Sequence, residues 1–177
     1  MYRTGNFVLY LIVLLVTVAL LCTREERKHF FAPQISPVRQ MAWGVGLFLG
    51  LIVVVGVINM AAAGHFSVFQ FIRLSAMQIF NFLCFQLLVA VTEEVLFRGC
   101  LTELGRRLKM PWLLIALISA ALFGAGHWLF NHDLVQLVTS FVIGFVFSAA
   151  FQRGKHCSLY SLIAAHFLYD LAIVNIP

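Results

Sequence analysis

Two adjacent glutamates and an arginine interrupt an otherwise apolar stretch in the middle of the chain. No charged residue occurs between Phe85 and Thr92, and Glu93, Glu94 and Arg98 follow directly. A charged side chain near the centre of a bilayer costs at least ~2.5–3.5 kcal/mol on insertion scales, so such residues are usually paired or functional. If this stretch lies in a membrane, the fold must therefore enclose a polar site inside an apolar bundle.

The spacing of these three residues assigns them different roles. Glu94 and Arg98 stand four residues apart with the acid first, which is the favourable order for an ion pair on one helical face. Glu93 points ~100° away from Glu94 around the helix axis and cannot share that pair. We therefore predict one structural glutamate, Glu94, and one glutamate that is available for chemistry, Glu93.

The composition places the chain in a membrane. Of its 177 residues, 62% are hydrophobic and 11% are charged, against about 25% charged residues in an average soluble domain. We predict a single all-α transmembrane domain over residues 1–177, surrounded by the lipid bilayer. The net charge of +5 is typical of topology signals and contact with anionic lipid, so nucleic acid is not an expected partner. The sequence assigns no oligomeric state.

Six apolar segments predict a bundle of about six transmembrane helices. The stretch His65–Arg73 between the second and third segments is mixed in polarity and is expected at the membrane interface. The third segment exceeds the ~20 residues that a bilayer needs, so it is expected to tilt, protrude or break. The expected helices are Asn6–Cys22, Met41–Ala63, Leu74–Leu108, Pro111–Phe130, Leu134–Gln152 and Ser158–Ile176.

Basic residues gather in alternate loops of this bundle. The N-terminus and the second loop carry only Arg3 and Arg73. Because cytoplasmic loops of membrane proteins are enriched in lysine and arginine, the first, third and fifth loops are expected in the cytoplasm and both termini outside. The basic residues of these three loops are Arg24, Arg27, Lys28, Arg39, Arg106, Arg107, Lys109, Arg153 and Lys155.

The later helices bring three further ionisable residues into the membrane, His127, His166 and Asp170. Asp170 follows His166 by four residues and shares its helical face. Glu93 and His127 lie equally far from Met110 along the chain, so two antiparallel helices place both ~25 Å from that turn. We predict that Glu93, His127, His166 and Asp170 meet in one intramembrane polar cavity. Small residues that allow close helix approach there are Gly124, Ala125 and Gly126.

This set of side chains suits the hydrolysis of an amide. A carboxylate and a neutral imidazole, here Glu93 and His127, can share a water molecule and deprotonate it. A second histidine, His166, kept protonated and oriented by Asp170, can stabilise an oxyanion. The chemistry requires no nucleophilic serine or cysteine and no cofactor.

Other functions use the same kinds of residue. Two histidines and a glutamate could instead hold Zn²⁺ with an open position, which would make a zinc-dependent membrane protease, although the HExxH pattern is absent. Buried Glu and His side chains also serve proton relays in transporters, but six short helices without a repeat disfavour that function. A non-catalytic membrane immunity or scaffold protein is the remaining alternative.

Three short motifs resemble those of one family. Glu93–Gly99 resembles the EExxxR motif of the CAAX-protease and bacteriocin-processing (CPBP, or Abi) family of intramembrane proteases. Phe123–His127 resembles its FxxxH motif, and His166–Asp170 resembles its HxxxN or HxxxD motif. The motifs occur in this order on successive expected helices. The resemblance covers about residues 80–173, and it leaves residues 1–79 as two N-terminal helices and an interfacial segment.

The resemblance implies a glutamate-type intramembrane endopeptidase in a bacterial or archaeal cell membrane. Its substrate would be a membrane-embedded or membrane-associated protein or peptide. By this resemblance Glu93 and His127 activate water, and His166 and Asp170 form the oxyanion site. The residues that would support this site are Glu94, Arg98 and Phe123.

The chain departs from the CAAX endopeptidases of the family in two ways. They carry Asn where this chain has Asp170, and a carboxylate donates no hydrogen bond unless it is protonated. Asp170 is therefore expected to orient His166 rather than to touch the oxyanion. The chain also has about six helices where those enzymes have eight. We therefore expect a role in peptide maturation or bacteriocin self-immunity rather than cleavage of a prenylated CAAX substrate.

Overall fold

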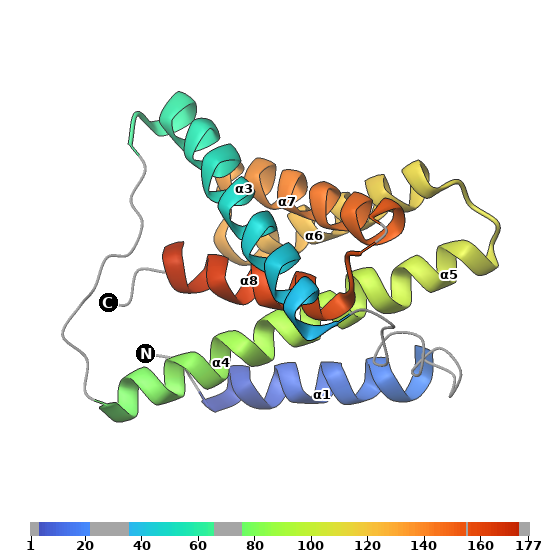
Figure 1. Ribbon diagram of the computed structural model, residues 1–177. Helices are drawn as coiled ribbons and strands as arrows, with labels where there is room; N and C mark the ends of the chain where they lie inside the picture. The colour runs from blue at the N-terminus through green and yellow to red at the C-terminus, as the bar shows by residue number, and fades with distance from the viewer. Residues whose placement is uncertain (1–3, 22–35, 66–75, 155, 174–177) are drawn as a thin grey trace.

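Helices account for every regular element in the part of the chain that the computed structural model describes, which is residues 4–21, 36–65, 76–154 and 156–173. Three consecutive elements, α4, η1 and α5, form one continuous helix, so six helical segments are present in this part of the chain (Figure 1). This confirms the predicted all-α bundle. The elements are α1 (Thr4–Leu21), α3 (Pro37–Ala63), α4 (Ala76–Glu94), η1 (Val95–Cys100), α5 (Leu101–Arg107), α6 (Trp112–Asn131), α7 (Leu134–Arg153) and α8 (Leu159–Ile173).

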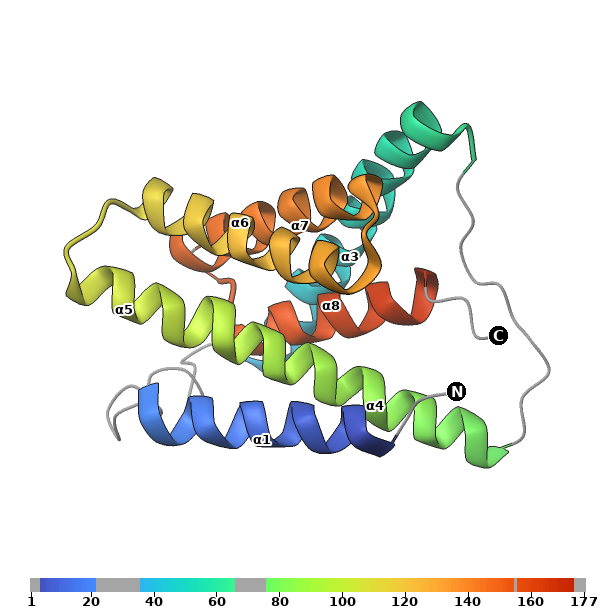
Figure 2. The same ribbon diagram turned by 180° about the vertical axis from the view of Figure 1, so that it is seen from behind.

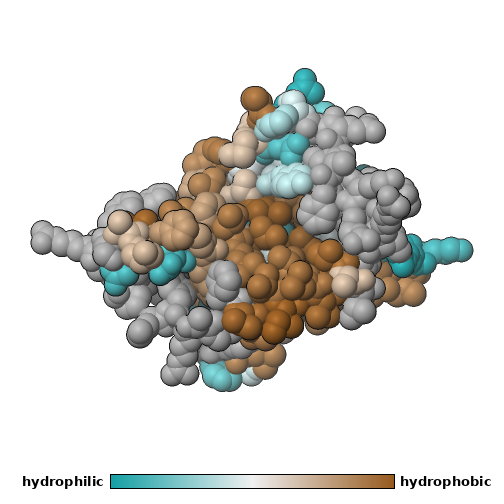
Figure 3. All heavy atoms as spheres, turned by 90° about the horizontal axis from the view of Figure 1, so that it is seen from below, coloured by the Kyte–Doolittle hydropathy of each residue, from teal (hydrophilic) through white to brown (hydrophobic). Residues whose placement is uncertain are grey.

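Four of these segments are long and apolar enough to cross a membrane, namely α3, the continuous helix from α4 to α5, α6 and α7. The remaining two, α1 and α8, are apolar but shorter within the described residues. Large apolar side chains on α1, such as Leu9, Ile12 and Leu15, are half or more exposed. Figure 3 shows a broad hydrophobic area on the side of the bundle where α1 lies, with hydrophilic residues at its margins. A large exposed apolar area marks a surface that contacts a membrane or another protein, and the four helices long enough to span a bilayer favour the membrane.

The helices run back and forth between two ends of the bundle. α1 lies beside α4, α6 packs against α7, and α8 packs against both α3 and α4 (Figures 1 and 2). Ser158 donates a hydrogen bond to Gln40 Oε1 at 3.0 Å, which joins the starts of α8 and α3. Arg153 lies over the Trp112 ring at 5.5 Å, which joins the end of α7 to the start of α6.

The first, third and fifth loops therefore start and end at the same end of the bundle, as the alternation of basic residues predicts. Arg39, Arg106, Arg107 and Arg153 all lie on helix termini at this end. Its position in the cytoplasm stays a prediction. The basic residues Arg24, Arg27, Lys28 and Lys155, and the expected interfacial stretch except for His65, lie outside the described residues.

The start of α3 was predicted wrongly. The helix begins at Pro37 rather than at Met41, because Ser36 caps it by accepting a hydrogen bond from the Arg39 backbone at 3.4 Å. Proline suits the first turn, where its missing N–H would have no helical partner. The starts of α6, α7 and α8 lie within one residue of the predicted positions.

The third helix is longer than a bilayer needs, and it continues without a break. It runs unbroken over Ala76–Arg107 and contains the π-helical segment η1, in which the Leu101 N–H bonds to the Leu96 carbonyl. Ser119 on α6 donates a hydrogen bond to the Phe97 carbonyl within this segment at 3.3 Å. Single π-helical turns inside α-helices are rare and frequent at functional sites. This one follows directly after the two glutamates.

α6 and α7 approach closely where glycines replace side chains. A Cβ on Gly124 would lie 2.9 Å from a backbone oxygen of α7, and a Cβ on Gly144 would lie 3.0 Å from the Ala120 Cα. A Cβ on Gly126 would meet nothing within 4 Å, and Ala125 is exposed. Of the three small residues expected to permit close approach, only Gly124 does so. The matching residue on α7, Gly144, was not predicted.

Gly124→Ala is therefore expected to lower the free energy of unfolding by about 1–3 kcal/mol, because the added methyl group forces α6 and α7 apart. Thermal unfolding of the detergent-solubilised protein measures the effect. Gly126→Ala is the matched control, since it adds the same methyl group two residues away into open space. Equal losses in both variants would contradict the close helix contact.

Candidate active site

The predicted pair of Glu94 and Arg98 is present and fully buried. Arg98 Nη1 lies 3.1 Å from Glu94 Oε1, and neither side chain has any exposed surface. Arg98 Nη2 also donates to the Gly144 carbonyl of α7 at 3.4 Å. The guanidinium carbon lies 4.6 Å from the centre of the Phe123 ring and 5.3 Å from that of Phe147. Arg98 thus ties the continuous helix to α6 and α7.

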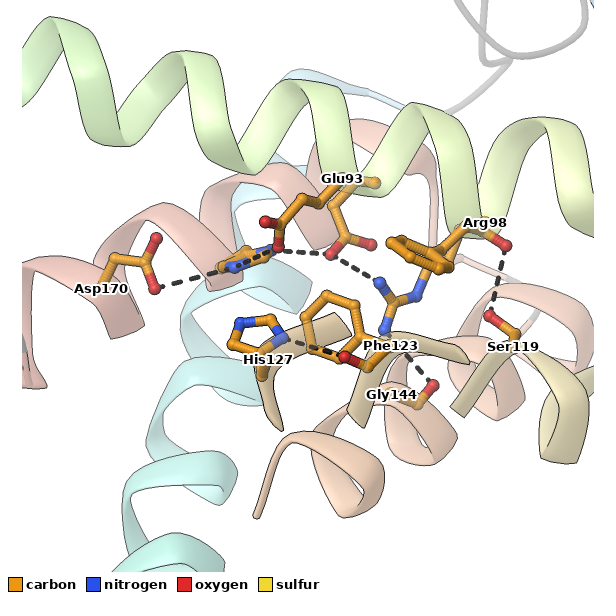
Figure 4. A network of polar contacts seen from close by, with 10 residues as sticks. Glu93, Arg98, Ser119, Phe123, His127, Gly144 and Asp170 are labelled. Carbon is orange, nitrogen blue, oxygen red and sulfur yellow. Dashed lines mark hydrogen bonds and ion pairs between the residues drawn. The ribbon is translucent and has the colours of Figure 1, made fainter. Parts of the chain in front are cut away.

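His166 on α8 has a carboxylate beside each of its ring nitrogens (Figure 4). Its Nδ1 lies 2.8 Å from Glu94 Oε1, and because an ionised carboxylate only accepts hydrogen bonds, Nδ1 is the donor. Its Nε2 lies 3.7 Å from both Glu93 Oε2 and Asp170 Oδ1. The shortest contact that orients the ring thus comes from Glu94, to which the sequence assigned only Arg98 as a partner.

Glu93 is held by a residue that sequence reasoning missed. The Tyr10 hydroxyl of α1 donates a hydrogen bond to Glu93 Oε1 at 3.1 Å. The other oxygen, Oε2, is buried and has no hydrogen-bond partner among the described residues. Its distance of 3.7 Å from His166 Nε2 is too long for a direct hydrogen bond, yet one oxygen atom could lie within reach of both. The sequence did contain a signal for this contact, because Tyr10 is a phenol in the largely aliphatic helix α1. Buried tyrosine hydroxyls usually find a polar partner.

His127 on α6 has one nitrogen engaged and is half-buried. Its Nδ1 lies 2.9 Å from the Phe123 carbonyl, which can only accept, so Nδ1 carries the proton. In the neutral ring the lone pair then lies on Nε2, as a general base needs. The Phe123 ring lies 4.6 Å from the His127 ring and 5.9 Å from the His166 ring, between centroids. Phe123 therefore packs against both histidines.

Contacts thus connect all the ionisable residues that the sequence singled out, and we call them the polar group: Glu93, Glu94, Arg98, His127, His166 and Asp170 (Figure 4). They come from the continuous helix, α6 and α8, as the motifs required. Glu93 and His127 are linked through His166 and Phe123. Their predicted sharing of one water molecule stays a prediction.

Two hollows in the described part of the bundle lie away from the polar group. One of about 420 Å³ lies between α3 and α7 and includes Gly46, Gly50 and Val146, and one of about 200 Å³ lies between α5 and α6 and includes Gly105 and Ile115. Neither includes a residue of the polar group, and both are apolar, so a polar cavity at the group itself stays a prediction. Within the described residues, no three His, Cys, Asp or Glu side chains are arranged to hold a metal ion.

Carboxylates and imidazoles that meet inside an apolar helical bundle are a candidate functional site of a membrane protein, because ionisable residues are rare there and usually have a function. The family model described as type II CAAX prenyl endopeptidase Rce1-like matches residues 74–172. The chain belongs to this family, which confirms the resemblance and makes it an integral membrane protease. The match begins just before α4 and excludes α1 and α3. Comparisons with curated proteins and with solved structures found no match.

Proposed function

We propose that this protein is an intramembrane endopeptidase that hydrolyses a peptide bond with water activated by Glu93 and His127. The observation that carries the proposal is the different hydrogen bonding of the two Glu93 carboxylate oxygens. Tyr10 holds Oε1, while Oε2 is buried, has no hydrogen-bond partner among the described residues and faces a histidine. A carboxylate oxygen that is oriented and unoccupied in this way suits a general base.

The proposed reaction assigns one step to each side chain. A water molecule beside Glu93 Oε2 loses a proton to Glu93, with His127 Nε2 as the second acceptor, while its oxygen attacks the peptide carbonyl carbon. The carbonyl oxygen becomes an oxyanion. When the tetrahedral intermediate collapses, the carbon–nitrogen bond breaks and the proton held by the base passes to the leaving amine.

His166 is the proposed donor to the oxyanion. Its Nδ1–H is occupied by Glu94 at 2.8 Å, which leaves Nε2–H of the imidazolium to point at the reacting oxygen. Asp170 lies 3.7 Å from the same Nε2 and supplies a second negative charge beside the ring. We therefore assign Asp170 to the orientation of His166, together with Glu94, and not to direct contact with the substrate.

The substrate is proposed to be a membrane-associated protein or peptide. The family description names a prenyl endopeptidase, so a prenylated peptide and a peptide without a prenyl group have to be compared. The purified protein in liposomes can be tested with three reporter peptides, namely a prenylated CAAX peptide, the same peptide without its prenyl group, and a transmembrane peptide. Cleavage of any of them supports the protease, and the pattern identifies the substrate class.

His127→Ala is expected to lower the cleavage rate of the reporter peptide about 10²–10⁴-fold, the usual contribution of a general base. The folded fraction should change little, because His127 is only half-buried. His156→Ala is the control, since His156 lies exposed in the turn before α8. Metal analysis of both preparations tests the zinc alternative: stoichiometric Zn²⁺ that is lost in His127→Ala would replace the proposed metal-free mechanism. Undiminished cleavage in His127→Ala would contradict its role.

A further inference from the structure

The helix α1 contributes to the polar group although it lies outside the part of the chain that matches the family. It packs against α4 and η1, the elements that carry the two glutamates and Arg98. Its side chain Tyr10 is half-buried and reaches Glu93 directly. The first helix is therefore placed to influence the residue that we propose as the base.

Three contacts fix the position of Tyr10 against α4. Its hydroxyl donates to Glu93 Oε1 at 3.1 Å, and its backbone carbonyl accepts from the Thr92 hydroxyl at 3.5 Å. Its ring meets the Phe85 ring edge to face, with 5.8 Å between the centroids. Thr92 is buried, and it precedes Glu93 directly. Tyr10 is thus held by its backbone, its ring and its hydroxyl at once.

We propose that Tyr10 is a positioning residue that holds Glu93 in its reactive orientation, which makes α1 a working part of the site. A glutamate side chain has several rotamers of similar energy, and the Tyr10 bond selects the one that turns Oε2 toward His166 Nε2. Tyr10 acts on one carboxylate oxygen and leaves the other for chemistry. This inference rests on the proposed role of Glu93.

The expected consequence is an effect on turnover rather than on substrate binding. Without the hydroxyl, the Glu93 carboxylate can rotate, and misplacement of a catalytic group by about 1 Å can cost ~10²-fold in rate. Tyr10→Phe removes only the oxygen and keeps the ring contact with Phe85. We expect kcat for the cleaved reporter peptide to fall about 10–100-fold, while KM and the thermal unfolding midpoint stay close to those of the parent protein.

Tyr160→Phe is the matched control, because Tyr160 is an exposed tyrosine in the first turn of α8. It should leave kcat unchanged. If kcat of Tyr10→Phe equals that of the parent protein while Glu93→Gln is inactive, the positioning role is overturned and the proposed function stands. If Glu93→Gln itself cleaves the peptide at the parental rate, the proposed function is overturned.

A second measurement does not depend on cleavage. Infrared difference spectra between the parent protein and Glu93→Gln identify the carboxylate band of Glu93 in the folded protein. Loss of the Tyr10 hydrogen bond should shift this band in Tyr10→Phe, and Tyr160→Phe should leave it in place. A band that is unchanged in Tyr10→Phe would show that the hydroxyl does not hold Glu93, whatever the activity.

Discussion

A protein that carries Glu93→Gln is expected to stay folded and to cleave its reporter peptide about 10²–10⁴-fold more slowly than the parent protein. The amide has the shape of the carboxylate, and its oxygen can still accept the hydrogen bond of Tyr10. It cannot, however, take a proton from water. The change therefore removes the proposed base while it leaves the packing of α1 against α4 in place.

The matched control is Glu103→Gln, the same substitution on the same continuous helix. Glu103 lies on α5, is partly exposed and pairs loosely with Arg107 at 3.7 Å. Initial cleavage rates of both variants in liposomes, together with their thermal unfolding midpoints, provide the measurement. Full activity in Glu93→Gln would sink the proposed mechanism. A low unfolding midpoint for Glu93→Gln alone would instead assign Glu93 a structural role.

Arg98→Met is expected to have the largest effect on stability, with a loss of about 3–5 kcal/mol in the free energy of unfolding. The substitution leaves the fully buried Glu94 carboxylate with His166 but without Arg98, and removal of one partner from a buried ion pair is strongly destabilising. It also removes the hydrogen bond to the Gly144 carbonyl and the contact of the guanidinium with the Phe123 ring. Thermal unfolding in detergent measures the loss.

A double variant shows how much of the stability loss in Arg98→Met comes from the unpaired charge and how much from lost packing. Glu94→Gln combined with Arg98→Met leaves no unpaired charge from this pair, so it should be more stable than Arg98→Met alone. It should nevertheless remain poorly active, because the amide can still accept a hydrogen bond from His166 Nδ1 but no longer places a negative charge beside the ring. Arg107→Met is the control, because it removes an arginine from an exposed ion pair on the same continuous helix. It should change the free energy of unfolding little. Wild-type stability in Arg98→Met would contradict the importance of the buried pair.

The spacing within single helices made part of the site predictable. Glu94 with Arg98, and His166 with Asp170, are pairs four residues apart, and the helical period alone brings such residues to one face. Both pairs are in contact in the structure. The alternation of basic loops likewise predicted which helix ends lie together, because each apolar segment must cross the bilayer once.

Contacts between helices were predictable only in outline. Equal distances from the turn near Met110 indicated that Glu93 and His127 belong to one region, but not that Phe123 and His166 lie between them. The close approach of α6 and α7 depends on Gly124 and Gly144 together, and a single sequence does not show which glycines face each other. The π-helical turn after Glu94 has no sequence signal that we recognise.

By itself the sequence predicted that the chain is an all-α membrane protein, that Glu94 pairs with Arg98, and that a second glutamate and two histidines lie in one region, where contacts link them in the structure. Those conclusions follow from composition, helical period and motif order, which are properties of neighbouring residues. The tertiary structure alone decided that Glu94 also binds His166 and that Tyr10 holds Glu93. These contacts join residues 72 and 83 positions apart, and such pairs are set by how helices pack rather than by any local pattern.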